Sequence, residues 1–186
     1  MIEKLPTYIE INGKRLAIRN KCDYRVVLDV ISALNDVELS EQEKLKCALY
    51  IFYEDIESVE DFEIIETATK EMMRVINNGE DFRENNEPQK PPIMNWEHDF
   101  KYLVAPINRV LSCEIREIKY LHWWTLLSAY MEIGECLFST IINIRRKKRT
   151  GKKLDDWERE FYRDNREMVD LPTQLTEDEK EFLYSE

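Results

Sequence analysis

The segment from Tyr120 to Met131 restricts the possible folds more than any other part of this chain, because as a helix it is apolar around most of its circumference. One side of that helix carries Leu121, Trp124, Leu127, Ser128 and Met131. The opposite side carries Trp123, Leu126, Tyr130 and Ile133. Such a helix must be covered on several sides, so we expect it to lie centrally in a packed core. Together with a later amphipathic stripe, it predicts the core residues Leu121, Trp123, Trp124, Leu127, Trp157 and Phe161.

The same segment is too short to span a membrane, because a bilayer needs about 20 apolar residues, and this one contains His122 and is followed by Glu132. Four glycines and six prolines among 186 residues are few, which favours long helices over a turn-rich β architecture. The net charge of −11 argues against a general nucleic-acid binder, since phosphate contacts need clustered cations.

The N-terminal residues carry the strongest local signal for β structure. Two β-forming runs, 8–11 and 14–18, are separated by Asn12 and Gly13, which readily adopt the positive φ angles of a tight turn. The sequence therefore predicts a β-hairpin. Because an isolated hairpin is marginally stable in water, it must pack on helices or pair with the edge of another chain.

Helical patterns dominate the rest of the chain. Asp23 is placed to cap a first helix that ends near Leu34, and Ser40 with Glu43 forms a capping box for a second. A third helix begins between Ser58 and Asp61. We therefore expect a mainly α, multi-helix globular protein with one N-terminal β-hairpin.

We divide the chain into four parts. Residues 1–79 hold the hairpin and the first helices, and residues 80–92, rich in proline and charge, form a linker or exposed loop. Residues 93–172 form a C-terminal helical region around the central aromatic helix, and residues 173–186 form an acidic tail. In the C-terminal region Pro106 interrupts a helical pattern, which predicts a kink or a break there.

The side chains that could perform chemistry do not form a reactive constellation. The four glycines are dispersed, so a phosphate-binding loop is excluded. Of the two histidines, we interpret His98 as solvated or capping, rather than as part of a metal cluster, and His122 as a hydrogen-bonded core residue. The protein is therefore not expected to be an enzyme, and no cofactor or metal is predicted.

The four cysteines, Cys22, Cys47, Cys113 and Cys136, show no metal-binding spacing, and the N-terminus has no signal-peptide core. We expect reduced, mostly buried thiols in a cytosol.

Seven cations lie between Arg145 and Lys153. Three interpretations remain open for this run: cations stabilising a helix C-terminus, contacts to nucleic acid, and contacts to an acidic block of a neighbouring subunit.

Three motifs carry a resemblance to a known family. They are Trp96–Asp99, then Leu121–Trp124, then Ile141–Arg146. In this order they resemble the C-terminal half of the tail assembly chaperones of long-tailed bacteriophages, from phages and prophages of Gram-positive hosts. The resemblance is best over about residues 93–170.

The resemblance implies a non-enzymatic protein of the host bacterial cytoplasm. Family members bind the tape measure protein, a long helical chain that sets tail length, keep it soluble and help to recruit tail tube subunits. Self-association is also expected, from the hairpin edge and from charges that alternate in blocks, whereas contact with a membrane or nucleic acid is not. The partner surface is predicted at Met72, Met73, Arg145, Arg146, Lys147 and Lys148.

The alternative is a small helical regulatory or nucleic-acid-associated protein that uses the basic run 145–153. It would require an affinity for DNA or RNA that falls steeply with salt.

Overall fold

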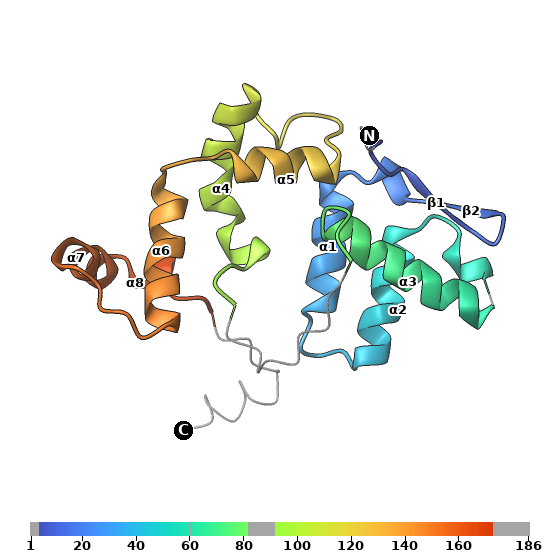
Figure 1. The fold of residues 1–186 in the computed structure, drawn as a ribbon, viewed down its shortest axis with the longest axis horizontal. Coiled ribbons are helices and arrows are strands. Elements are labelled where there is room, and N and C mark those ends of the chain that lie inside the picture. The colour runs from blue at the N-terminus through green and yellow to red at the C-terminus, as the bar shows by residue number, and fades with distance from the viewer. Residues whose placement is uncertain (1–3, 60, 82–91, 173–186) are drawn as a thin grey trace. The chain divides into compact units, whose positions relative to one another are not determined.

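A computed structural model of the protein describes residues 4–59, 61–81 and 92–172, and in these ranges it contains one two-stranded hairpin and eight α-helices (Figure 1). The predicted fold class, mainly α with an N-terminal β-hairpin, is confirmed. The described residues form two compact units: unit 1 contains 4–59, 61–81 and 118–128, and unit 2 contains 92–117 and 129–172.

This division differs from the predicted one, because residues 118–128 belong with the N-terminal helices and not with the C-terminal region. Most of the predicted linker 80–92, and the predicted acidic tail 173–186, lie outside the described residues.

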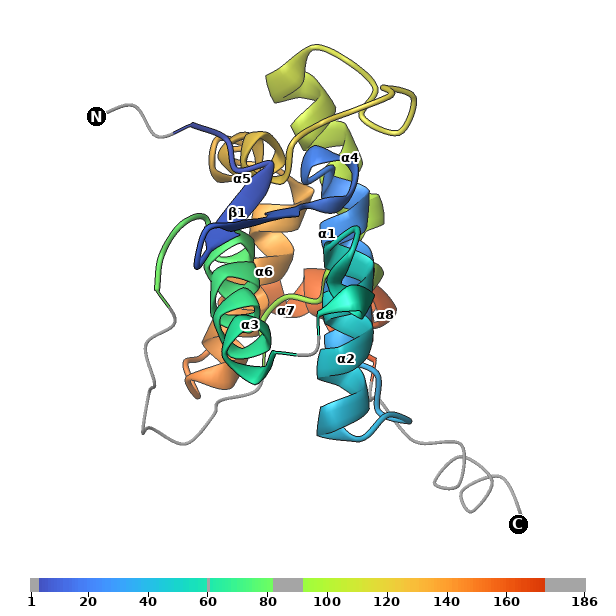
Figure 2. The ribbon, with the colours of Figure 1, turned by 90° about the vertical axis from the view of Figure 1, so that its right-hand side faces the viewer.

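The hairpin of unit 1 consists of β1 (Tyr8–Ile11) and β2 (Lys14–Ala17), which pair antiparallel. Asn12 and Gly13 connect them with φ angles of 51° and 76°, and two positive φ angles are those of a type I′ turn. The apolar side chains of the hairpin, Ile9, Ile11 and Leu16, are buried. Helix α3 (Phe62–Ile76) runs beneath the hairpin and contacts β1 (Figures 1 and 2).

The other helices of unit 1 begin where the capping signals predict. The Asp23 carboxylate caps α1 (Tyr24–Leu34), and Ser40 and Glu43 form the capping box of α2 (Glu41–Phe52). Asp61 caps α3, whereas the proposed earlier start at Ser58 falls in a separate 3-10 turn, Ile56–Ser58. The largest fully buried side chains of this unit are Ile18, Phe52, Tyr53, Met72, Trp123 and Leu126.

Unit 2 contains α4 (Trp96–Leu111), α6 (Leu137–Arg149), α7 (Asp156–Asp164) and α8 (Arg166–Val169). Its core consists of Leu103, Ile107, Ile115, Phe138, Ile141 and Ile144. Of the two outcomes predicted at Pro106, the helix break is wrong, because α4 continues through this residue, and the kink stays a prediction. The buried ring of Pro106 takes part in the core, which offsets the loss of one backbone donor.

The aromatic helix, α5 (Trp123–Met131), is shorter and less enclosed than its composition suggests. Trp123, Leu126 and Ala129 are buried, but Met131 at its last turn is 63% exposed. Trp124, Leu127 and Tyr130 are half-buried, so the helix is covered only in part on its other sides. Its first residues belong to unit 1 and its last ones, from Ala129, to unit 2.

All four cysteines are free thiols, but only Cys22 is buried, so the expectation that most are buried is wrong. Burial raises the pKa of the Cys22 thiol to about 12. We therefore expect a maleimide reagent at neutral pH to label the exposed Cys113 first, and Cys22 only after unfolding, because the thiolate is the reacting form. Mass spectrometry of digested, labelled protein measures this order, and labelling of folded Cys22 as fast as Cys113 would contradict it.

Candidate partner-binding site

The paired tryptophans of the 121–124 motif have a structural role in unit 1. The indole N–H of Trp123 donates to the carbonyl of Ile76 at 2.9 Å, and that of Trp124 donates to the carbonyl of Val75 at 2.8 Å. These carbonyls belong to the last turn of α3, where no further helical turn supplies donors, although that of Val75 also accepts from the backbone N–H of Asn78 at 3.2 Å. The two tryptophans therefore cap the C-terminus of α3.

His122, the residue before them, is buried and connects the start of α5 to the N-terminal segment through its ring nitrogens. Its Nδ1 accepts a hydrogen bond from the backbone N–H of Trp124 at 3.0 Å, so the ring proton lies on Nε2 and is donated to the carbonyl of Pro6, also at 3.0 Å. Both ring nitrogens are thus engaged in a neutral imidazole. The interpretation of His122 as a hydrogen-bonded core histidine agrees with this geometry.

The buried His122 makes stability depend on pH. Burial lowers its pKa below the usual 6.5, although the bond to Pro6 and the charge of Asp23 act in the opposite direction. The unfolded chain therefore binds more protons between the two pKa values, and the free energy of unfolding should fall as pH drops below about 6.5. In His122→Asn, whose amide can still accept from Trp124, we expect this part of the pH dependence to be absent in urea titrations between pH 7 and pH 5. An unchanged slope would contradict this assignment.

The predicted methionine surface is only partly available. Met72 is fully buried in the core of unit 1, and Met73 is half-buried. The prediction that Met72 contacts a partner is therefore wrong. Its position in α3 places it on the same buried side as Ile64, Ala68 and Val75.

Arg145, the first residue of the predicted cationic surface, is buried in unit 2 and cannot contact a partner there, so this part of the prediction is wrong. All five of its N–H groups have acceptors within unit 2. Two donate to the Asp99 carboxylate, at 2.6 and 2.9 Å, and the other three donate to the carbonyls of Ile93, Met168 and Val169. The guanidinium therefore joins α4, α6 and α8.

The carboxylate of Asp99 is fully buried, and both of its oxygens have hydrogen-bond donors. Besides Arg145, it accepts from the backbone N–H of Asn95 at 2.9 Å, and it lies 2.8 Å from Nδ1 of His98. Burial alone would raise the pKa of Asp99, but the hydrogen bonds from Arg145, Asn95 and His98 outweigh it and lower the pKa. Removing one partner of such a buried pair would leave an uncompensated charge, which is strongly destabilising.

His98 is half-buried in this network, so of the two interpretations, solvated or capping, the solvated one does not describe it. Its Nε2 lies 3.3 Å from the carbonyl of Glu167, which connects the start of α4 to α8. Nothing in its sequence neighbourhood indicates either partner, because Arg145 and Glu167 lie 46 and 69 residues away from Asp99 and His98.

The other cations of the run 145–153 fall into two groups. Lys147 is paired with Glu158 of α7, and Lys148 contacts Tyr162 and Asp170. These contacts place the C-terminal end of α6 against α7. The remaining four, Arg146, Arg149, Lys152 and Lys153, are exposed.

Trp157, predicted to be in the core, is 59% exposed, so this prediction is wrong. In α7 the inward position is taken by Glu158, which is held by Lys147 and by the capping box with Asp155. Trp157 therefore points outward and lies against the half-buried Phe161 ring, with centroids 5.6 Å apart. We call Trp157, Phe161 and the exposed cations Arg146, Arg149, Lys152 and Lys153 the α7 surface. The other predicted core residues, Leu121, Trp124 and Leu127, are half-buried.

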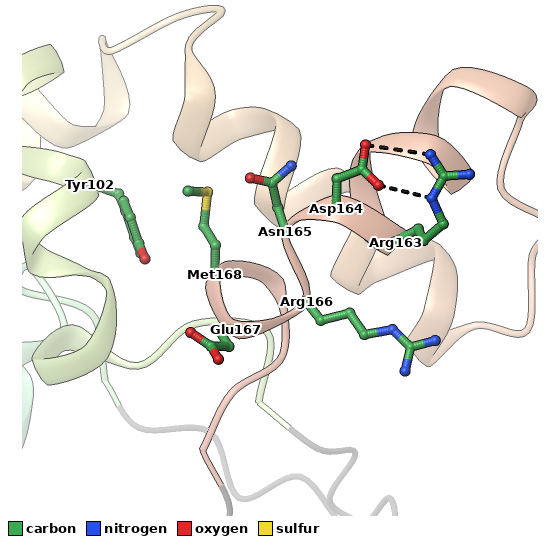
Figure 3. A pocket seen from close by; sticks show the side chains of 7 residues that line it. All are labelled: Tyr102, Arg163, Asp164, Asn165, Arg166, Glu167 and Met168. Atoms are coloured by element: carbon green, nitrogen blue, oxygen red, sulfur yellow. Dashed lines mark hydrogen bonds and ion pairs between the residues drawn. The ribbon is translucent and has the colours of Figure 1, made fainter.

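A second feature of unit 2 is an open pocket of about 500 Å³, lined by Tyr102 and by residues 163–168 (Figure 3). Tyr102 faces Met168 across it, whereas the side chains of Arg163 and Arg166 extend away from Tyr102. Arg163 is paired with the neighbouring Asp164 at 2.8 Å. The pocket therefore lacks converging polar groups of the kind that bind a small substrate.

Two features are absent from the part of the chain that the structure describes. Among residues 4–59, 61–81 and 92–172, no helix is long and apolar enough to cross a membrane. In the same ranges, no three histidine, cysteine or acidic side chains are grouped so that they could hold a metal ion.

The geometry defines a mainly α-helical protein with exposed aromatic and cationic side chains on one helix pair. The chain belongs to the bacteriophage Gp15 protein family, whose family model matches residues 1–171. No curated protein and no solved structure matches the chain. The match confirms that this is a protein of a bacteriophage family, and it includes the N-terminal residues that the sequence motifs left out.

Proposed function

We propose that this protein is a tail assembly chaperone of the host bacterial cytoplasm that binds the tape measure protein, keeps it soluble and helps to recruit tail tube subunits. Membership of a bacteriophage family and the resemblance of the 96–99, 121–124 and 141–146 motifs support this role. Such a chaperone acts through reversible contacts with another polypeptide and needs no catalytic group.

The observation that carries the proposal is the exposed Trp157 on the α7 surface, which lies against the half-buried Phe161. A tryptophan lying against a phenylalanine offers a large apolar area, and tryptophan is enriched among residues that dominate binding energy. The exposed cations at the end of α6 and in the segment that leads to α7, among them Arg146, Lys152 and Lys153, suit acidic side chains along the edge of a bound helix. We therefore expect the partner to present an amphipathic helix with an acidic border.

Co-expression with the tape measure protein of the same phage tests the proposal. We expect the wild-type chain to keep the tape measure protein in the soluble fraction and to co-purify with it, and Trp157→Ser to lose most of this effect. Phe62→Ser is the matched control, because Phe62 in unit 1 is 76% exposed and its replacement removes an aromatic side chain elsewhere.

If the tape measure protein stays insoluble at every ratio with the wild-type chain, the chaperone role is wrong. If Trp157→Ser and Phe62→Ser both behave as the wild type, the binding surface lies elsewhere.

Self-association is part of the same proposal. Residues 93–153 carry eleven basic and six acidic side chains, whereas residues 1–92 carry twelve basic and twenty acidic ones, so copies can attract one another through opposite blocks. Light scattering at low salt should give a mass above the 22.4 kDa of one chain. A strict monomer at high concentration would contradict it.

A further inference from the structure

The outer edge of β1 has unused backbone hydrogen-bonding groups. The N–H of Ile18 donates to the carbonyl of Thr7 at 3.0 Å, and Ile9 and Ile11 stand opposite Leu16 and Lys14. In an antiparallel ladder alternate residues bond to the partner strand, so Thr7, Ile9 and Ile11 face β2. The N–H and carbonyl groups of Tyr8 and Glu10 therefore point away from β2.

The opposite edge of the hairpin confirms this alternation. Ala17, which stands opposite Tyr8, accepts a hydrogen bond from the N–H of Glu54 on the far side of β2, at 3.1 Å. The next residue, Ile18, forms a β-bridge with Tyr53. The β2 edge is thus partly closed, whereas no described residue is hydrogen-bonded to the backbone of Tyr8 or Glu10.

The open edge of β1 borders a groove whose other wall is α3. Thr67, Glu71, Arg74 and Val75 line it and share one face of α3, with spacings of four, seven and eight residues. The half-buried Trp124 also lines the groove, whose volume is about 280 Å³. Figure 1 shows α3 below the hairpin, and α3 contacts β1.

We propose that this groove binds an extended segment of another polypeptide, which adds a strand to β1 opposite Tyr8 and Glu10. Strand addition between a sheet edge and a helix uses backbone hydrogen bonds for affinity and side-chain pockets for specificity. One apolar side chain of the segment would enter the groove against Val75 and Trp124. This site belongs to unit 1 and does not depend on the proposed chaperone role.

The groove also indicates which segment fits. Its charged lining residues, Lys4, Glu10, Glu71 and Arg74, sum to zero, and Glu71 lies 3.7 Å from Arg74, so the segment needs no net charge. It should alternate apolar and polar residues and lack proline where it pairs, since proline has no N–H. A second copy pairing through its own β1 would bring a second α3 into the same space, so we assign the groove to an isolated strand.

A phage-displayed library of 12-residue peptides is the probe. We expect selection against the purified chain to enrich peptides with alternating apolar residues. Their affinity should fall at least tenfold for Thr67→Trp, which fills the groove from an exposed position on α3. Lys70→Trp is the matched control, because Lys70 is exposed on the same helix but does not line the groove, and it should bind as the wild type.

Backbone N-methylation of one selected peptide gives a second measurement that does not depend on the stability of a variant. Methylating every other residue should abolish binding, and methylating the residues between them should not, because only alternate N–H groups face β1. A library that yields no binder, binders unaffected by Thr67→Trp, or methylation effects without alternation would each overturn the proposal. A dimer that Thr67→Trp dissociates would also overturn it, in favour of a second copy as the occupant.

Discussion

Replacing Arg145 with methionine is expected to lower the free energy of unfolding by about 3–5 kcal/mol, because it leaves the buried Asp99 carboxylate without its cation. Three backbone carbonyls, from Ile93, Met168 and Val169, lose their donor in the same variant. Urea denaturation followed by circular dichroism measures the loss, and hydrogen exchange should show the earliest opening at α8.

The neighbouring residue provides the control for this experiment. Arg146 precedes Lys147 on the same helix but is exposed, so Arg146→Met should change the free energy of unfolding by no more than about 0.5 kcal/mol. Equal and small effects of the two substitutions would show that the Arg145–Asp99 pair does not hold unit 2 together.

The same pair predicts how unit 2 responds to acid. The pKa of Asp99 is lower in the folded protein than its ordinary 3.8, so its contribution to stability is complete above that value. As pH falls through 3.8 towards the lower folded pKa, the unfolded chain takes up the proton first and the contribution is lost. In Arg145→Met this loss should be smaller, because the cation that lowers the pKa is absent.

Truncating Trp123 is the second substitution with a large expected effect. Trp123→Ala should lower the free energy of unfolding by about 3–5 kcal/mol, because the indole is 1% exposed and its removal leaves a cavity. The variant also removes the hydrogen bond to the Ile76 carbonyl at the end of α3. Thermal unfolding followed by circular dichroism measures the change.

Substitutions of two other tryptophans serve as comparisons for Trp123→Ala. Trp124→Phe keeps a ring but loses the bond to the Val75 carbonyl, and a single hydrogen bond is worth about 1 kcal/mol. Trp157→Ala should cost less than Trp123→Ala by a wide margin, because Trp157 is mostly exposed. Similar losses for Trp123 and Trp157 would contradict the burial that distinguishes them.

Local signals in the sequence predicted local structure well. The Asn12–Gly13 turn and the caps at Asp23 and Ser40 were recognisable because each depends on residues within a few positions of one another. The fold class followed from the same signals and from helical periodicity.

Contacts between distant residues could not be predicted in this way. Asp99 and Arg145 each look like ordinary surface charges in sequence, and only the packing of α4 against α6 shows that they pair. Periodicity also could not separate Trp123 from Trp157, since both occur in amphipathic patterns and only tertiary packing decides which is covered. For this reason the sequence predicted a partner site that includes the buried Met72 and Arg145, whereas the structure favours the α7 surface.

Because residues 118–128 belong to unit 1, the two units are not consecutive in sequence, and this affects both folding during synthesis and the design of truncated fragments. The N–H groups of Asn77, Asn78 and Gly79 can cap the last turn of α3 at once, but the two indole N–H donors follow only when Trp123 and Trp124 have been synthesised, more than forty residues later. A fragment that ends at residue 81 would lack the two tryptophans that bond to α3. A fragment that begins at residue 92 would include residues 118–128, which pack in unit 1. Neither half is a self-sufficient fragment, so biochemical work on this protein calls for the intact polypeptide.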